Sequence, residues 1–160
     1  MNTSLDVSAQ DSIMSILIVC DRSTELATLI GMTGTAVPDD EVRGFSHPAT
    51  ALDWCENRTP DLVLVDMLMR ATNGIELIRR LRALPHMAGV PLVLMLPRGF
   101  EQVASSALRH GASDFLATPA VQAELAARLG NLLALRNARL AAGGPALAAS
   151  AGFAGRALVH

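Results

Sequence analysis

The sequence predicts an α/β fold, a doubly wound parallel sheet of five strands with helices on both faces. Segments typical of strands and segments typical of helices alternate five times along the 160 residues. Several strand segments are apolar throughout, as expected for strands that helices cover on both faces. The chain length suits one domain of this kind.

The first two predicted strands frame the first predicted helix. The apolar, β-branched run Ser15–Asp21 predicts a buried strand. Ser23–Leu29 predicts a helix, and we expect it to end at Gly31 and Gly34 because glycine disfavours a helix interior. Asp40–Phe45 predicts the second strand, with a weaker pattern.

The central part of the chain continues this alternation. Pro48–Asn57 begins with proline, which is favoured at a helix N-terminus, and its apolar residues share one helical face. Asp61–Asp66 and Val90–Leu96 predict the third and fourth strands. Between them, Gly74–Leu84 carries apolar residues at helical spacing and predicts a helix.

The C-terminal part completes the fold and adds a tail. Glu101–Arg109 predicts a helix, Ser113–Ala117 a short fifth strand, and Pro119 to about Leu140 one long helix. The expected division of the chain is a mobile polar segment at 1–14, a domain with an extended last helix at 15–140, and an Ala/Gly-rich tail or truncated linker at 141–160.

The composition excludes several classes of function. The net charge of -2 and the pI of about 6.0 argue against direct nucleic-acid binding, and all thirteen cationic residues are arginine. Two cysteines are too few for a disulfide framework, and the four histidines match no metal-ligand spacing. The sequence shows neither a signal peptide nor an apolar run of membrane-spanning length. We therefore expect a cytoplasmic protein without membrane association.

Two carboxylates are expected to meet at the carboxyl edge of the sheet. Asp21 ends the first predicted strand and Asp66 ends the third. In the common strand order 2-1-3-4-5 these strands are neighbours, and ligands of such sheets bind where the strand order reverses. Two simpler readings stay open: Asp21 could cap the helix that starts near Ser23, and Asp66 could be retained without chemistry.

Four spaced motifs around these carboxylates resemble the receiver domain of bacterial two-component response regulators. They are "ILIVCD", "VDMLMRATNG", "VPLVLML" and "GASDFLATP", and the resemblance extends from about Ser15 to Leu135. It implies a flavodoxin-like fold. It also implies that Asp66 takes a phosphoryl group from a histidine kinase, and that Asp21, Asp66 and the backbone carbonyl of Leu68 help to hold Mg²⁺.

The sequence departs from the family pattern around the reaction site. Cys20 stands where the first of two acids is usual, and a thiol is a poor Mg²⁺ ligand. Leu96 replaces a hydroxyl residue, Thr118 replaces a lysine, and Arg70 replaces a proline. Only Asp21 and Asp66 remain of the usual five-residue set, so we expect Mg²⁺ binding to be weak.

Other side chains offer partial compensation for these losses. The guanidinium of Arg70 or Arg98 could bind an anion, and Thr118 could donate a hydrogen bond. Phe115 matches the aromatic residue that changes rotamer during activation in the family, and with Leu96 nearby we expect packing to lock it. Cys20 itself is expected to be a small buried residue.

Three functions fit these observations, and none makes the chain itself an enzyme. The first is a receiver-like interaction module whose signal does not depend on phosphorylation. The second is a true phosphoacceptor that uses Asp66 with unusual auxiliary residues. The third is a small-molecule binding domain, although no glycine-rich phosphate loop follows the first strand. We rank the first above the second. The implied partners are proteins, namely a histidine kinase or an output domain or protein.

The long last helix predicts a weak homodimer. Its leucines repeat at spacings of three, four and seven residues and form an apolar stripe, which Arg136 interrupts. A helix that reaches Leu140 is expected to overshoot the sheet. Leu133 and Leu140 would then face water unless a second chain or an output domain covered them.

Overall fold

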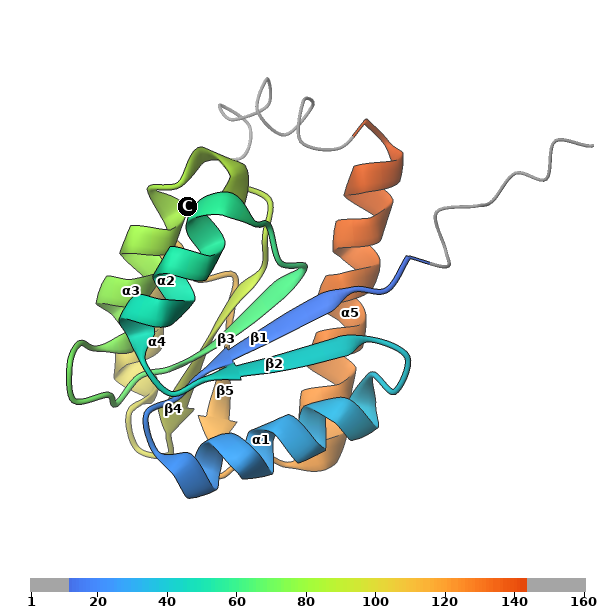
Figure 1. Cartoon of the computed structure of the whole chain (residues 1–160). Coiled ribbons are helices and arrows are strands. Elements are labelled where there is room, and N and C mark those ends of the chain that lie inside the picture. The colour runs from blue at the N-terminus through green and yellow to red at the C-terminus, as the bar shows by residue number, and fades with distance from the viewer. Residues whose placement is uncertain (1–11, 144–160) are drawn as a thin grey trace, which may run out of the picture.

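A computed structural model describes residues 12–143 and confirms the predicted fold class (Figure 1). Five parallel strands form one sheet in the order β2-β1-β3-β4-β5. The strands are β1 (Ser15–Val19), β2 (Glu41–Phe45), β3 (Leu62–Asp66), β4 (Leu92–Pro97) and β5 (Asp114–Thr118). The helices are α1 (Ser23–Ala36), α2 (Pro48–Asn57), α3 (Gly74–Arg82), α4 (Ala104–Arg109) and α5 (Gln122–Ala141), with 3-10 turns at η1 (Pro85–Met87) and η2 (Glu101–Val103).

Helices cover both faces of the sheet, which explains the continuous apolar strands. α1 and α5 lie together on one face, and α2, α3 and α4 lie on the other (Figure 1). In β1, Ile16 and Ile18 face the layer of α1 and α5, whereas Leu17 and Val19 face the opposite layer. All four side chains are buried. A strand that is buried on both faces is apolar throughout and does not alternate between apolar and polar residues.

The first helix is longer than its sequence predicts. α1 runs to Ala36, so the expectation that Gly31 and Gly34 would end it is wrong. Leu29 and Thr33 of this helix are buried against the rest of the domain. Packing of one helical face supplies most of the stability of a helix in a protein, and here it outweighs the low helix propensity of two glycines.

Smaller differences occur at the element ends. β1 ends at Val19, so Cys20 and Asp21 lie in the turn after the strand rather than in it. The predicted helix Glu101–Arg109 is divided into η2 and the short helix α4. The long last helix begins at Gln122, after the cis peptide bond between Thr118 and Pro119.

α5 packs on the sheet farther along its length than expected. Leu133 is only 6% exposed and belongs to the core formed with α1, so the expectation that it faces water is wrong. Arg136 does not break this contact, because it is buried itself and its Nε donates to Asp61 Oδ1 at 3.1 Å. Leu140 is exposed as expected.

The ends of the chain lie beyond this description. The expected mobile segment 1–14 falls outside the described residues except for its last three positions, and the tail 141–160 does so beyond Gly143. Within residues 12–143, none of the helices combines the length and apolarity that a membrane crossing requires.

Candidate functional site

Asp66 occupies the carboxyl end of β3, the central strand of the sheet. Its neighbours in the sheet are β1 on one side and β4 on the other, where Met95 is its register partner. Asp66 is only 1% exposed. A carboxylate this deeply buried must be paired or hydrogen-bonded, and its partners therefore define what the site can do.

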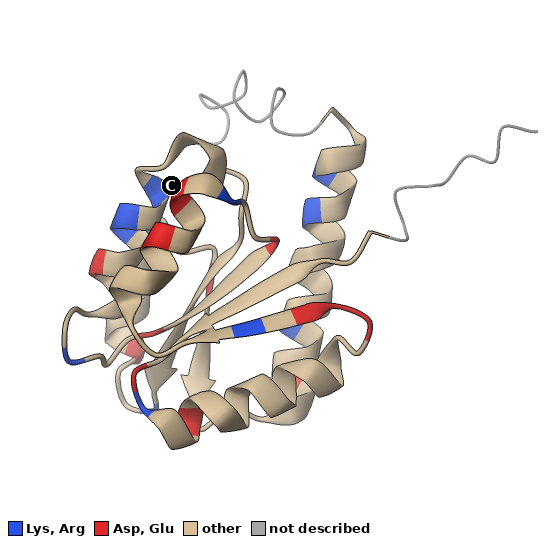
Figure 2. Cartoon of the chain, viewed as in Figure 1, with Lys and Arg blue, Asp and Glu red and all other residues tan. Residues whose placement is uncertain are grey.

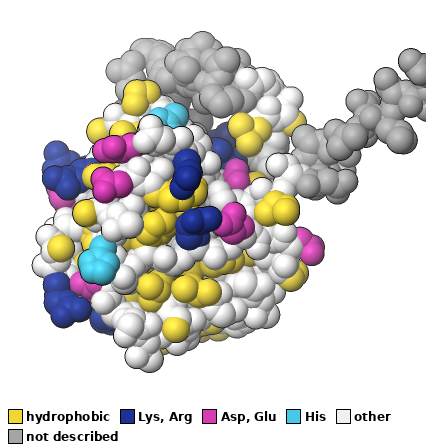
Figure 3. Space-filling view, in the orientation of Figure 1, with side chains coloured by type: hydrophobic (Ala, Val, Ile, Leu, Met, Phe, Trp, Pro, Cys, Tyr) yellow, Lys and Arg dark blue, Asp and Glu magenta, His cyan; other side chains and the backbone are white. Residues whose placement is uncertain are grey.

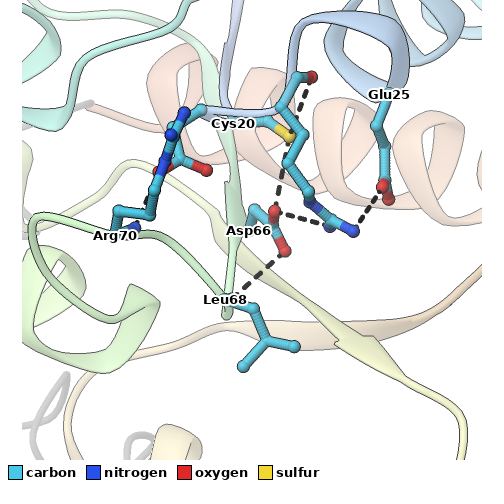
Figure 4. A network of polar contacts seen from close by, with 7 residues as sticks. Cys20, Glu25, Asp66, Leu68 and Arg70 are labelled. Carbon is cyan, nitrogen blue, oxygen red and sulfur yellow. Dashed lines mark hydrogen bonds and ion pairs between the residues drawn. The ribbon is translucent and has the colours of Figure 1, made fainter.

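Arg22 is the main partner of Asp66, and the sequence analysis did not single it out. Its Nη2 lies 2.8 Å from Asp66 Oδ2, while its Nη1 lies 2.7 Å from Glu25 Oε2 (Figure 4). The hydrogen bond to Asp66 raises the pKa of the guanidinium, so Arg22 stays charged. The only signal in the sequence is its position directly after Asp21, in the turn that lies over the same edge of the sheet.

Cys20 donates a second hydrogen bond to the same carboxylate oxygen. Its Sγ lies 3.3 Å from Asp66 Oδ2 and 3.7 Å from the carbonyl oxygen of Arg22. Burial raises the pKa of this thiol to about 11, and the hydrogen bond to Asp66 acts in the same direction. The thiol is therefore protonated at neutral pH and serves as a hydrogen-bond donor. Its burial confirms the expectation made from the sequence.

The other oxygen of Asp66 is also engaged. The backbone N–H of Leu68 donates to Oδ1 at 3.3 Å, so donors reach both carboxylate oxygens (Figure 4). Close packing fixes the backbone here, because a Cβ on Gly74 would lie 2.6 Å from the carbonyl oxygen of Asp66. Asn73 then starts α3 by accepting the N–H of Glu76 at 2.9 Å. These contacts explain the Asn-Gly pair of the motif.

Asp21 lies at the same edge but is bound to a different partner. Its Oδ2 accepts the backbone N–H of Arg70 at 2.7 Å and lies 3.5 Å from Arg70 Nε. The reading of Asp21 as a helix cap is wrong, because α1 has Arg22 at its cap position and no side chain caps it. Arg70 thus binds Asp21, and no hydrogen bond or ion pair joins Arg70 to Asp66.

The remaining residues of the predicted site are spread around this centre. Leu96 and Thr118 are buried at the ends of β4 and β5. Phe115 is half-buried and packs against the core on the α3 and α4 side. Arg98 is exposed, and its Nη2 lies 3.5 Å from the carbonyl oxygen of Pro119. The structure thus brings Asp66 together with Cys20 and Leu68, but not with Arg98.

The donor set fits Mg²⁺ poorly. Mg²⁺ prefers hard oxygen ligands, whereas the group nearest to Asp66 from the end of β1 is a thiol. Of the two carboxylates at this edge, one is paired with Arg22 and the other with Arg70. Across residues 12–143, three or more His, Cys, Asp or Glu side chains do not gather anywhere in a metal-binding arrangement.

A parallel sheet of order 2-1-3-4-5, with an aspartate at the tip of its central strand, defines a flavodoxin-like domain. The chain belongs to the response regulator receiver domain family, whose model matches residues 16–130. The resemblance stated from the motifs is thereby confirmed.

Two curated relatives show how this domain is used elsewhere. Over 123 residues the chain is 38% identical to the cyclic di-GMP phosphodiesterase response regulator RpfG of Xanthomonas campestris pv. campestris, a match that covers 77% of this chain and 32% of that protein. Over 118 residues it is 33% identical to the phosphate regulon transcriptional regulatory protein PhoB of Pseudomonas aeruginosa, covering 72% of this chain and 49% of that protein. The chain thus spans half or less of these relatives.

Solved receiver structures share the fold. A putative response regulator from Chloroflexus aurantiacus is 28% identical and superimposes with a TM-score of 0.71, over 77% of this chain and 99% of that one. The receiver domain of sensor histidine kinase PA1611 from Pseudomonas aeruginosa is 22% identical with a TM-score of 0.68, over 77% and 99% of the two chains. That structure has a magnesium ion coordinated in its active-site cleft.

Proposed function

We propose that this receiver domain is an atypical one, which passes a signal through protein contacts and does not require phosphorylation of Asp66. One observation carries the proposal: the guanidinium of Arg22 lies 2.8 Å from the buried carboxylate of Asp66. The guanidinium supplies positive charge next to the carboxylate of Asp66. A bound metal ion would otherwise have to supply that charge.

The contacts of Asp66 work against its use as a nucleophile. Phosphoryl transfer needs a free carboxylate oxygen in line with the phosphorus and positive charge around the transferred oxygens. Here Oδ2 accepts from both Arg22 and Cys20, and Oδ1 accepts from Leu68. An attack by Oδ2 would first have to break one of its two hydrogen bonds, and the hydrogen bond from Leu68 lowers the nucleophilicity of Oδ1.

The groups that stabilise a phosphoryl oxygen in the family are also missing. Leu96 has no hydroxyl, and Thr118 has no positive charge. By analogy, removing one donor from the oxyanion hole of an acyl-transfer enzyme costs roughly 3–4 kcal/mol. Because Cys20 replaces an acid and Arg22 already supplies a positive charge, we infer that Mg²⁺ binds only weakly.

The second candidate is a true phosphoacceptor, and the same arginine favours it. A guanidinium binds phosphate oxygens well, so Arg22 could turn from the carboxylate of Asp66 to a phosphoryl group attached there. Its side chain is about half exposed, which leaves room for such a turn. A small-molecule binding domain, the third function considered, gains no support from the site.

The proposal includes what surrounds the domain. We infer that its partners are proteins, a histidine kinase or an output domain or protein, since its relatives include a hybrid histidine kinase and an enzyme-type regulator. Any enzymatic activity would then belong to the output part rather than to this domain. The cytoplasmic location stays a prediction.

Intact mass spectrometry after incubation with acetyl phosphate and Mg²⁺ tests the proposal. We expect no phosphorylated species in the wild-type chain. Arg22→Ala leaves Oδ2 of Asp66 with the hydrogen bond from Cys20 alone, so it is the variant in which slow phosphorylation would be expected first. A gain of one phosphoryl group in the wild type that vanishes in Asp66→Asn would establish the second candidate instead. A typical receiver domain, treated in parallel, shows that the phosphodonor is active.

A further inference from the structure

The open edge of β2 offers backbone groups to a second strand. Among residues 12–143, β2 pairs with β1 alone, through bonds such as the Glu41 N–H to the Met14 carbonyl at 2.8 Å and the Cys20 N–H to the Phe45 carbonyl at 3.0 Å. Since alternate residues of a strand face its neighbour, Val42 and Gly44 direct their N–H and C=O groups away from the sheet. A free edge of this kind is a template for strand addition.

The charges beside this edge are arranged in a self-complementary way. Glu41 and Arg43 lie two residues apart on the same face of β2 and form an ion pair. Figure 2 shows an acidic and a basic segment on this strand. The guanidinium of Arg43 lies 5.6 Å from the ring centre of Trp54, which restricts its motion. Figure 3 shows basic and hydrophobic side chains gathered together on this face of the molecule.

The helix next to the edge has a flank without bulky side chains. Ile30 of α1 packs under Gly44, and Ala27, Gly31 and Gly34 follow on the neighbouring side of the helix. A Cβ added at Gly31 or Gly34 would meet nothing within 4 Å, so no contact within the described chain requires a glycine at either position. Each glycine costs about 1 kcal/mol relative to alanine in a helix interior. Close approach of another surface would explain both.

We propose that a second copy of this chain adds to the open edge, with the two β2 strands antiparallel around a two-fold axis at Val42. This register places Glu41 of each copy opposite Arg43 of the other, on the face that carries Trp54. Val42 then lies opposite itself, and the two residues exchange their free N–H and C=O groups. The small flanks of the two α1 helices lie on the same side of the extended sheet.

Charge selects this register over its neighbour. Only pairs of outward-facing residues can exchange hydrogen bonds, so the nearest alternative pairs Val42 with Gly44 and centres the axis on Arg43. That arrangement sets two guanidinium groups directly opposite each other, and like charges in opposed positions destabilise a sheet. The Val42 register instead forms two opposite-charge pairs. The contact involves no atom of Asp66, so it does not depend on the proposed function.

Sedimentation velocity on charge variants of the full chain tests the pairing. We expect a concentration-dependent dimer in the wild type and at least tenfold weaker association in Glu41→Arg and in Arg43→Glu. An equimolar mixture of these two variants should dimerise again, because each then supplies the charges that the other lacks. The double variant Glu41→Arg, Arg43→Glu should also recover. Circular dichroism confirms that each variant is folded.

A crosslinking experiment tests the register. Val42→Cys should form a disulfide-linked dimer under mild oxidation, since opposed residues in a hydrogen-bonded antiparallel pair have a Cα separation near 5.5 Å. The wild-type chain, whose Cys20 and Cys55 are buried, measures the background level of crosslinking. Arg43→Cys should crosslink instead if the alternative register forms. A monomer at all concentrations, or a dimer that the charge variants leave unchanged, would overturn the proposal. Asp66→Asn should dimerise as the wild type does, so the result of this test does not depend on whether Asp66 is phosphorylated.

Discussion

The guanidinium of Arg22 reaches from the turn after β1 to the carboxylate of Asp66 at the end of β3, with Nη2 and Oδ2 2.8 Å apart. The two partners differ in exposure, since the arginine side chain is about half exposed and the aspartate is buried. The pair therefore sits at the boundary between solvent and core. It places a cation directly against the carboxylate at the tip of the central strand.

Removing the arginine should destabilise the fold. We expect Arg22→Ala to lower the free energy of unfolding by about 1–3 kcal/mol, because a buried carboxylate loses its charged partner. Urea denaturation at neutral pH measures this loss. In the background Asp66→Asn the same substitution should have a much smaller effect, and equal losses in both backgrounds would show that the pair is not coupled.

Mg²⁺ affinity should be limited by the side chains at the end of β1. Cys20→Asp combined with Arg22→Ala supplies an oxygen ligand and removes the competing cation, so we expect binding to become about tenfold tighter or more. Isothermal titration calorimetry measures the affinity directly. Millimolar or tighter binding by the wild type that depends on Asp21 and Asp66 would contradict the expectation of weak binding.

The two cysteines should make the fold sensitive to alkaline pH. Burial raises the pKa of Cys20 and of Cys55 to about 11, from 9.0. Between these values the unfolded chain loses thiol protons that the folded chain keeps, so stability falls as pH rises. We expect a loss of about 2–3 kcal/mol between pH 8 and pH 10 for the two thiols together.

Thiolate absorbance distinguishes this effect from others, because the chain contains neither lysine nor tyrosine. The native protein should titrate near pH 11 and the protein in urea near pH 9. Arg82 acts in the opposite sense above pH 10, since burial lowers its pKa to about 10. Replacing Cys55 by alanine should halve the pH dependence below that point. Native thiols that titrate at pH 9 would contradict the prediction.

Two leucines of α5 offer a matched comparison. Leu133→Ala should lower the free energy of unfolding by about 2–5 kcal/mol, because it opens a cavity in the core beneath α5. Leu135 is 47% exposed, so Leu135→Ala should change stability by less than about 0.5 kcal/mol. Thermal unfolding of both variants measures the difference. Equal effects would mean that the distal part of α5 does not pack on the sheet.

The sequence by itself determined the architecture, and it also showed which family residues are missing from the site. Strand and helix periodicity are local properties, so alternation along the chain predicts five covered parallel strands and places Asp66 at a strand end. The missing hydroxyl and lysine at Leu96 and Thr118 are likewise visible without coordinates. The helical spacing of apolar residues over Gly74–Leu84 predicts a helix there, and the structure confirms it as α3, Gly74–Arg82.

Only the tertiary structure decided which groups meet. Arg22 and Asp66 are far apart in the chain, and their contact depends on the register of β1 against β3 and on the direction of the arginine side chain. The partner of Asp21 likewise depends on tertiary structure, because Asp21 accepts a hydrogen bond from the backbone N–H of Arg70, which is distant in sequence. The burial of Leu133 depends on how far α5 packs along the sheet. Periodicity records which face of an element is apolar. It does not record what lies opposite that face, because that is set by contacts between residues distant in sequence.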